Sequence, residues 1–303
     1  MTASRSPHAS ATAIGCIAIL VWATLALLTD HAGDIPPFQL VAMAFALGTI
    51  PGLVNVAVTR TSPIVMLRIP LAAWLVGIGG LFGYHFFYFI ALRNAPAVEA
   101  NLINYLWPLL IVLFSALLPG ERLRWWHIGG ALLGLLGTLV LVTGGDGFTF
   151  QREYLGGYAA ALACAVIWAG YSVLNRRFAH IPTVAVAGFC AVTAVLAGVS
   201  HLLLESTVRP EGAQWLAVAG LGLGPIGTAF YVWDHGTKHG DIRVLGTMSY
   251  AAPLLSTLVL IGFGRADGTI AVLIACLLIV TGAVLASGRL VPGARRHQLK
   301  PAR

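Results

Sequence analysis

Ten uncharged stretches, each long enough to cross a lipid bilayer as one helix, dominate this chain. A membrane-spanning helix needs roughly 20 predominantly apolar residues, because each residue adds about 1.5 Å to its length. Short charged segments separate the stretches, so neighbouring helices are expected to run antiparallel. The chain is therefore predicted to be an all-α polytopic protein with ten transmembrane helices, embedded in the lipid bilayer. The stretches are 6–29, 35–59, 69–92, 100–120, 125–145, 154–175, 178–204, 212–233, 244–264 and 268–288.

The composition excludes an ordinary soluble protein. Hydrophobic residues make up 58% of the 303 residues, charged residues make up 10%, and the mean hydropathy is +0.86. No clean small-residue cleavage motif follows the first stretch, which is therefore expected to be a retained helix rather than a signal peptide. The cysteines lie within apolar stretches and show no CxxC spacing, so we expect no disulfide framework, no metal site and no cofactor. They are Cys16, Cys164, Cys190 and Cys276.

Basic residues predict the orientation. If the N-terminus lies in the cytoplasm, fourteen of the eighteen Lys and Arg residues fall on the cytoplasmic side. Basic residues in short loops set the orientation of a membrane protein, so both ends are predicted to be cytoplasmic. The segment 289–303 then forms a basic cytoplasmic tail. The net charge of +7 reflects this topology, and nucleic acid is not expected as a partner.

The two halves of the chain resemble each other. Trp22-Ala-Thr recurs as Trp168-Ala-Gly, and Tyr105-Leu-Trp-Pro108-Leu recurs as Tyr250-Ala-Ala-Pro253-Leu. Five helices per half is an odd number, so the second half must enter the membrane upside down. This 5+5 inverted repeat is typical of secondary transporters, which bind substrate in a central cavity between the halves. We predict one repeat over 12–145 and a second over 154–288.

Polar residues interrupt the stretch between Glu99 and Glu121. Asn101, Asn104, Tyr105 and Pro108 share one helical face. Pro108 has no N–H and crowds the carbonyl of Asn104, so both Pro108 and its counterpart Pro253 are expected to kink their helices. Unpaired backbone at membrane depth needs cover from protein or from a water-filled cavity, which favours a helix that lines a cavity. The alternative is a kinked helix whose amides bond to neighbouring helices.

The run ALRNAPAVEANLINYLWPLLIVLFSALLPGERL, followed by GGALLGLLGTLVLV, resembles the drug/metabolite transporter superfamily with two EamA-type repeats. The segments VEANLINYLWP, AVIWAGYSVLNRRFA and HGD…SYAAPLLS are similar to the YddG-type aromatic amino-acid exporters of bacterial inner membranes. This resemblance covers about residues 12–288. It implies ten helices, cytoplasmic termini and export of aromatic and other neutral amino acids from the cytoplasm by alternating access.

Aromatic and polar residues at membrane depth are the candidate substrate-binding residues. Tyrosine and tryptophan normally gather at the membrane interfaces, so a group at depth beside a histidine indicates a site. Their rings offer faces to an aromatic side chain or an ammonium group, and phenol, amide and imidazole groups can bind a carboxylate. The alternative is aromatic packing between helices. The candidates are Trp22, Tyr84, His85, Tyr88, Asn101, Tyr105, Trp107 and Trp168.

Two residues are candidates for proton coupling. His85 titrates near neutral pH when unperturbed, although it could equally form a neutral hydrogen bond between helices. Asp234 is the only acid within an otherwise apolar stretch, and an interfacial ion pair with Lys238, four residues on, is the alternative. Arg93 and Lys238 occupy equivalent positions at the two mouths, where either could meet a carboxylate or a phospholipid.

Other functions fit the sequence less well. A different small metabolite or drug on the same fold is the main alternative, but a nucleotide sugar would require membrane-buried basic residues, which the stretches lack. An enzyme is not expected, because no HExxH, GxSxG or paired intramembrane aspartate occurs. A monomer is compatible with the sequence. Glycine pairs at i, i+4 predict close helix contacts at Gly79 and Gly83, and at Gly130 and Gly134.

Overall fold

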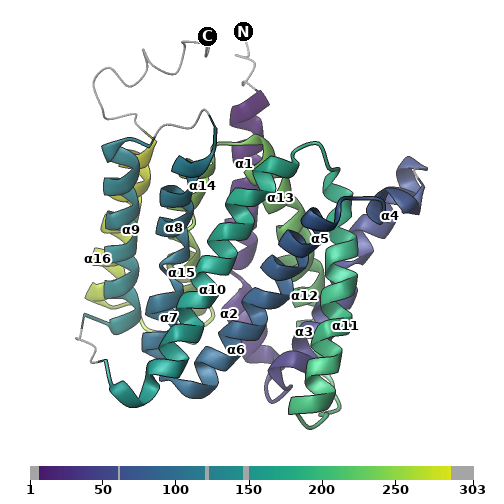
Figure 1. Ribbon diagram of the computed structural model, residues 1–303. Coiled ribbons are helices and arrows are strands. Elements are labelled where there is room, and N and C mark those ends of the chain that lie inside the picture. Colours follow the sequence, from purple (N-terminus) through teal and green to yellow (C-terminus); the bar gives the residue numbers. More distant parts are fainter. Residues whose placement is uncertain (1–6, 61, 120–122, 146–149, 288–303) are drawn as a thin grey trace, which may run out of the picture.

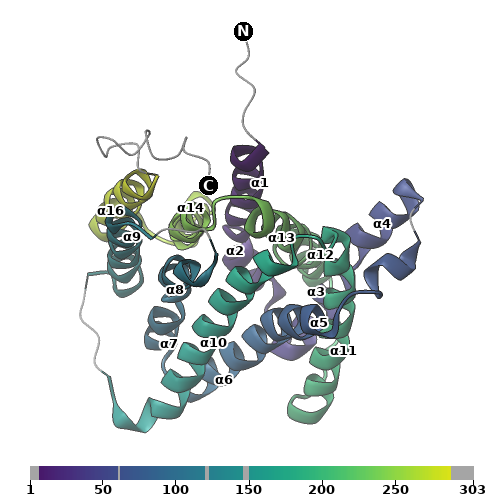
Figure 2. The same cartoon turned by 45° about the horizontal axis from the view of Figure 1, so that its top comes forward.

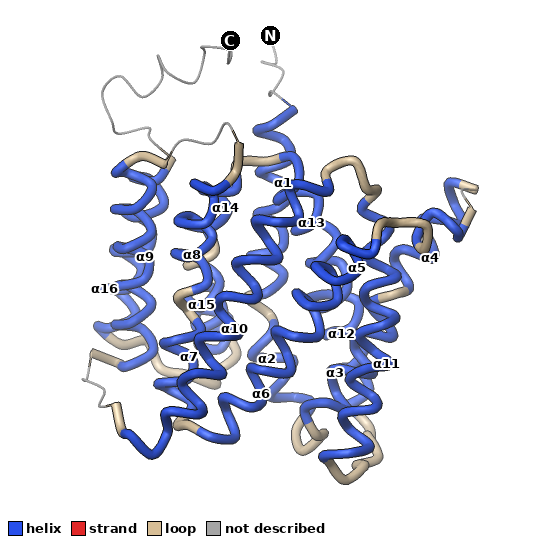
Figure 3. The backbone as a smooth tube through the Cα atoms, in the orientation of Figure 1, coloured by secondary structure: helices blue, strands red, loops and turns tan. Residues whose placement is uncertain are grey.

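The computed structural model describes residues 7–60, 62–119, 123–145 and 150–287, and every regular element in these ranges is a helix (Figures 1 and 3). The basic tail predicted over 289–303 lies outside the described residues. The α-helices are α1 (Pro7–Trp22), α2 (Leu25–Ala32), α3 (Pro37–Gly48), α4 (Ile50–Thr59), α5 (Leu71–Ile78), α6 (Tyr84–Asn94), α7 (Ala97–Asn104), α8 (Trp107–Phe114), α9 (Trp125–Thr143), α10 (Leu155–Leu174), α11 (Val186–Leu204), α12 (Ala213–Leu223), α13 (Ala229–His239), α14 (Ile242–Met248), α15 (Ala251–Gly262) and α16 (Ile270–Ala286).

These helices join into membrane-length spans. Nine helical segments of the described chain are long and apolar enough to cross a membrane, and α16 adds a shorter apolar helix. The chain therefore crosses the molecule ten times, as the sequence predicts. The helix α1 begins and α16 ends at the same face, at the top of Figure 1. We call this face the termini face.

Every span of the first repeat packs against a span of the second. The contacting pairs are α1 with α13, α3 with α11, α6 with α10, α8 with α14, and α9 with α16. Figure 2 shows α10 crossing the middle of the molecule, with α9 and α16 at one end and α3 and α11 at the other. Each pair joins one repeat to the other, so the interface between the repeats runs through the centre of the protein.

Helix breaks occur where the sequence predicts them. The fourth span breaks at Tyr105 and Leu106, just before Pro108, which is the second residue of α8. The ninth span breaks at Ser249 and Tyr250, before Pro253 in α15. A proline lacks the N–H for the preceding turn and its ring crowds the carbonyl four residues back, which opens the helix there. Both predicted kinks are thus present.

The first span also breaks, without a proline. The helix α1 ends at Trp22, and α2 begins at Leu25. The hydroxyl of Thr24 donates to the carbonyl of Val21 at 2.8 Å, a local bond that competes with the regular helical pattern. The equivalent stretch of the second repeat, α10, continues unbroken past Trp168.

Each repeat also contains a π-helical turn, at Gly79–Gly83 and at Gly224–Thr228, 145 residues apart. Such a turn inserts an extra residue into a helix and often occurs at functional sites. The expected close contact at Gly79 and Gly83 is wrong, because Gly79 has open space around it. The close approaches are instead at Gly77 and Gly80, which lie against aromatic rings of the second repeat. The prediction for Gly130 is confirmed, since it packs on the backbone of α16.

Candidate functional site

Four tryptophans meet where the two repeats join. Trp22 ends α1, Trp107 begins α8, Trp168 lies in α10 and Trp233 lies in α13. Their ring centroids lie 5.1 to 6.3 Å apart in all six pairings, within the range of aromatic contact. Each repeat contributes two of them. We call this group the tryptophan cluster; three of its members were predicted from the sequence and Trp233 was not.

Tyrosine and histidine rings of α6 extend the tryptophan cluster away from the termini face. The ring of Tyr84 lies 5.3 Å from that of Trp168 and stacks on Tyr88 at 5.9 Å. His85 contacts Tyr84 at 5.3 Å and Phe45 at 5.2 Å. Tyr84, His85 and Tyr88 therefore join Trp168 in one continuous aromatic group.

The amides of the fourth span hold these phenols in place. The hydroxyl of Tyr88 donates to Oδ1 of Asn101 at 2.7 Å, and Nδ2 of Asn104 donates to the hydroxyl of Tyr84 at 3.1 Å. The amides thus bond to a neighbouring helix, which was the alternative to direct cavity lining. Oδ1 of Asn104 is fully buried and has no hydrogen-bond partner among the described residues.

Several polar groups beside the tryptophan cluster remain free. The indole N–H groups of Trp107 and Trp168, and the hydroxyl of Tyr105, have no hydrogen-bond partner in the part of the chain that the structure describes. Tyr105 makes no ring contact with the described aromatic residues, but it lies near enough to interact electrostatically with Tyr84 and Tyr88. His85 donates through Nδ1 to the carbonyl of Leu81 at 2.7 Å, since a carbonyl can only accept, and this leaves Nε2 as an acceptor. The available groups are therefore uncharged donors and one acceptor.

The residues of α6 that belong to this aromatic group are only partly buried. Every residue from Phe82 to Ile90 is half-buried, and Tyr105 is half-buried as well. Successive residues of a helix point about 100° apart, so this pattern leaves surface uncovered on every side of α6, including the side that carries Tyr84 and His85. By contrast, Trp233 is 0% exposed. The α6 residues of the group are therefore less enclosed than Trp233 in α13.

A second polar group lies between the tryptophan cluster and the termini face. Asp234 is completely buried and accepts hydrogen bonds from Asn175 at 2.9 Å, Thr183 at 2.7 Å and Lys238 at 2.9 Å. Lys238 is also buried and donates to the carbonyl of Ile181 at 3.0 Å. The predicted Asp234–Lys238 pair is present, but protein encloses it rather than the membrane interface. Lys238 is consequently not free to meet a substrate.

The sequence of this chain is similar to those of known membrane transporters. The EamA-like transporter family matches residues 10–143 and again residues 155–288. The chain belongs to the EamA-like transporter family. It is 56% identical to the aromatic amino acid exporter YddG of Ancylobacter novellus over 281 residues, which cover 92% of this chain and 98% of that protein. It is 27% identical to the protein of the same name from Escherichia coli K12, over 82% of this chain and 86% of that protein.

A solved crystal structure supports the same assignment. It shares 56% sequence identity with this chain, superposes with a TM-score of 0.88, and the match covers 92% of this chain and 98% of that one. Membership in a transporter family assigns the chain to multi-pass membrane transporters rather than to enzymes. The described residues contain no group of three or more metal-binding side chains.

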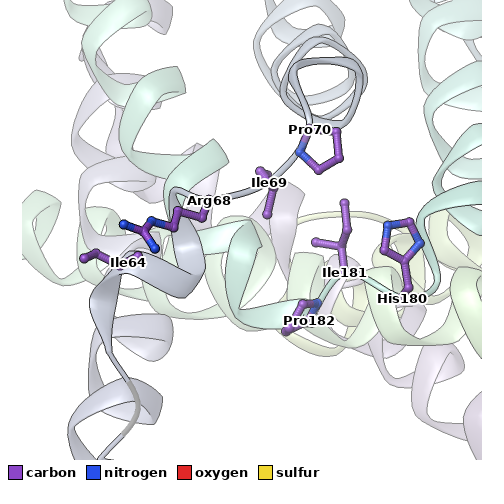
Figure 4. A pocket seen from close by; sticks show the side chains of 7 residues that line it. All are labelled: Ile64, Arg68, Ile69, Pro70, His180, Ile181 and Pro182. Atoms are coloured by element: carbon purple, nitrogen blue, oxygen red, sulfur yellow. The ribbon is translucent and has the colours of Figure 1, made fainter.

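A pocket opens on the termini face of this EamA-like transporter. It has a volume of about 360 Å³ and lies where the connection before α5 meets the connection between α10 and α11 (Figure 4). In Figure 4 the Arg68 side chain extends toward Ile64, and His180 lies on the other side of Ile181. The lining residues are Ile64, Arg68, Ile69, Pro70, His180, Ile181 and Pro182.

The repeat offset could have found two of the residues that sequence reasoning missed. Adding 145 to His85 and Tyr88 leads to Phe230 and Trp233, and both lie in the aromatic group. Phe230 contacts Trp168 at 5.7 Å and stacks on Phe45 at 5.6 Å. Asn175 and Thr183, by contrast, have no such signal, because their role depends on the fold of the α10–α11 connection around Asp234.

Proposed function

We propose that this protein exports aromatic and other neutral amino acids from the cytoplasm by alternating access between its two repeats. The observation that carries this proposal is the aromatic group at the junction of the repeats, half-buried on the α6 side and fully buried at Trp233. Inverted-repeat transporters bind substrate at such junctions. The relative from Ancylobacter novellus is named an aromatic amino acid exporter, which favours aromatic amino acids as the substrates.

The site suits a zwitterion with an apolar ring. The rings of Trp168, Trp107 and Tyr84 offer faces on which an aromatic side chain or an ammonium group can stack. The free N–H groups of the two indoles and the hydroxyl of Tyr105 can donate to a carboxylate. None of these groups carries a fixed charge, so binding need not be tight and release need not be slow.

We place Trp22, Tyr84, His85, Tyr88, Tyr105, Trp107 and Trp168 along the substrate cavity. In this proposal Asn101 and Asn104 orient the phenols, and Trp22 closes the cavity by donating its indole N–H to the carbonyl of Pro225 at 3.1 Å. That carbonyl lies in the π-helical turn before α13, so Trp22 ties the first repeat to this turn of the second. His85 is the candidate for proton coupling, because Nε2 is free to accept a proton.

The proposed location is the bacterial inner membrane, with both termini cytoplasmic and the protein acting as a monomer without nucleic acid. Fourteen of eighteen basic residues support this orientation. Reporter fusions after Asp34 and Glu205 should read as external, and a cytoplasmic signal from either would contradict the orientation.

Uptake into proteoliposomes tests the function. Reconstituted protein should move phenylalanine and tryptophan, move threonine less well, and not move lysine or glutamate, whose charges the site does not compensate. Transport of an unrelated metabolite without any amino acid would favour the alternative, a different small-molecule exporter of the same family. Such exporters occur among the relatives, for example the pseudopaline exporter CntI of Pseudomonas aeruginosa, which is 26% identical over 204 residues.

A further inference from the structure

Asp234 and Lys238 fasten the α10–α11 connection to the end of α13. Asn175, at the end of α10, donates to Asp234 and to the hydroxyl of Thr237, and Thr183 donates to Asp234 from the start of the next span. Lys238 donates to the carbonyl of Ile181 in the same connection. We call Asn175, Thr183, Asp234 and Lys238 the polar clasp.

The polar clasp lies on the path between the termini face and the tryptophan cluster. Ile181, to which Lys238 is bound, lines the pocket on the termini face. Below the clasp, the indole of Trp233 donates to the hydroxyl of Ser172 at 3.1 Å, and both residues are completely buried. The path therefore passes from an open pocket through buried side chains to the buried side of the cluster.

Among the described residues, the other mouth lacks the polar clasp at the repeat-related positions; a different pair, His201 and Glu205, links the end of α11 to the start of α3 there. At the repeat offset of 145, Asp234 corresponds to Phe89 and Lys238 to Arg93. Arg93 is exposed, and no acid stands four residues before it. The residues beside the two positions also differ in burial, since Tyr84 is half-buried whereas Trp233 is 0% exposed.

The chemistry of the clasp suits repeated opening. Removing one partner from a buried ion pair is strongly unfavourable, because it leaves a charge without compensation. Asp234 and Lys238 lie on the same helix, so they stay paired when the α10–α11 connection moves away. The bonds that then break involve only neutral partners: the hydroxyl of Thr183, the amide of Asn175 and the carbonyl of Ile181. Each of these bonds is charge-assisted, but breaking it leaves the Asp234–Lys238 pair intact, so the opened state holds no unpaired charge.

We propose that the polar clasp is the gate on the termini face, and that it must open and close once in each transport cycle. This inference rests on the proposed transport function, because a gate has meaning only for a substrate that crosses. It assigns Asp234 to gating rather than to carrying a proton, since hydrogen bonds from Asn175, Thr183 and Lys238 already occupy its carboxylate. Thr183 and Asn175 are positioning residues in this gate and do not touch the substrate.

Thiol labelling from a defined side tests the gate without any substrate. In a protein whose four native cysteines are replaced by alanine, Ser172→Cys places one thiol between the clasp and the tryptophan cluster. A membrane-impermeant thiol reagent is added to vesicles on the side that carries the C-terminus, which protease cleavage of a C-terminal tag identifies. Thr183→Val removes one bond to Asp234 and should raise the labelling rate about tenfold, the change expected for about 1.4 kcal/mol. The double variant Asp234→Asn with Lys238→Met should raise it at least as much.

Thr257→Val is the matched control. Thr257 is also half-buried, but its hydroxyl donates within its own helix to the carbonyl of Pro253 at 3.0 Å, so labelling should stay at the starting rate. Unchanged labelling in both clasp variants, or an equal rise in Thr257→Val, would overturn the gate. Labelling needs no substrate, so it is independent of the transport assay. Failure of amino-acid transport would contradict the proposed function, whereas the labelling rates alone decide the gate.

Discussion

The two repeats share a backbone plan but differ in the chemistry that they place on it. Both carry a π-helical turn at equivalent positions and a helix break before an equivalent proline. At six equivalent positions the first repeat carries polar side chains that are half-buried, apart from the buried Asn104, whereas the second carries buried residues that are mostly aromatic or small. The equivalent pairs are Tyr84 and Ala229, His85 and Phe230, Tyr88 and Trp233, Asn101 and Gly246, Asn104 and Ser249, and Tyr105 and Tyr250.

This difference distinguishes the residues that shape the backbone from the residues that could bind a ligand. Turns and breaks depend on glycine and proline, which act on the backbone and therefore work in either orientation. A ligand is itself asymmetric, so hydrogen-bonding side chains can be needed on one side of it only. One repeat can therefore carry them, while the other supplies the buried residues around Trp233 and Tyr250, which we call the packed wall. Tyr250 illustrates the wall: it is completely buried and its hydroxyl accepts from the backbone N–H of Leu109 at 3.1 Å, whereas the hydroxyl of its counterpart Tyr105 is free.

The largest expected effect is at the packed wall. Trp233→Ala should lower the free energy of unfolding by roughly 3–5 kcal/mol, because it removes a completely buried ring that contacts the other three tryptophans. Thermal unfolding in detergent measures it. Trp125→Ala is the control, since that ring is 64% exposed and should change stability little. Equal losses in the two variants would mean that Trp233 is not a packing centre.

Trp168→Ala should affect the substrate more than the fold. Loss of a stacking face worth roughly 0.5–1.5 kcal/mol weakens the apparent affinity about three- to tenfold. The loss should be larger for phenylalanine and tryptophan than for threonine, which has no ring. Proteoliposome uptake at matched protein levels, together with Tyr105→Ala, gives the comparison. An equal loss for every substrate would assign Trp168 to packing, and full activity in both variants would remove both from the site.

The two prolines allow the equivalent breaks to be compared. Pro108→Ala restores an N–H and lets the helix close between α7 and α8, which should reduce transport more than expression. Pro253→Ala should have a smaller effect on substrate affinity, because its break adjoins the packed Tyr250 rather than the free Tyr105. The measurement is uptake against substrate concentration for both variants. Unchanged transport in Pro108→Ala would reduce the first break to a packing feature.

Tyr88→Phe removes the bond to Asn101 and leaves the ring in place. A net loss of roughly 1 kcal/mol is expected for one such hydrogen bond, about a fivefold change if it appears in apparent affinity. Tyr231→Phe is a matched control at the other side of the molecule, where the hydroxyl donates to the carbonyl of Gly48 at 3.0 Å. Weaker substrate affinity in Tyr231→Phe alone would contradict the placement of the site.

The smallest effect concerns helix starts that differ between the repeats. Asp241 accepts from the backbone N–H of Arg243 at 3.0 Å and pairs with its guanidinium at 3.1 Å, whereas Pro96 stands at the equivalent start of α7. Burial of Asp241 raises the pKa of its carboxyl, but the bonds from Arg243 outweigh this and hold the pKa below the usual 3.8.

A lowered pKa in the folded state means that the charged form stabilises the fold above pH 3.8, and that this contribution disappears as the pH falls through the folded-state pKa. Asn can keep the capping bonds but not the ion pair or the negative charge at the helix start, so Asp241→Asn should cost roughly 0.5–1 kcal/mol near neutral pH and progressively less in acid. Unfolding temperatures of both proteins across pH 3 to 7 measure it. A constant difference across this range would exclude the ionised Asp241 as its source.

Much of the aromatic group could be predicted from sequence because aromatic residues at depth are conspicuous. Trp22, Trp107 and Trp168 were proposed as site residues from position alone, and the structure brings their rings within 6.3 Å of one another, while their contact with substrate stays a prediction. The bonds of Asn101 and Asn104 could not be assigned, because a helical face shows direction but not the partner. Phe45 gave no signal, since a phenylalanine in an apolar stretch looks the same whether it faces lipid or a neighbouring ring.

By itself the sequence determined the ten spans, the repeat and the positions of the two proline breaks. These depend on local quantities, namely the length of an apolar run and the missing N–H of proline, which hold in any surroundings. Only the tertiary structure decided which side of the aromatic group is fully buried and what Asp234 binds. Those properties depend on contacts between Asn175, Thr183 and Lys238, which come together around Asp234 only when α10, α11 and α13 pack.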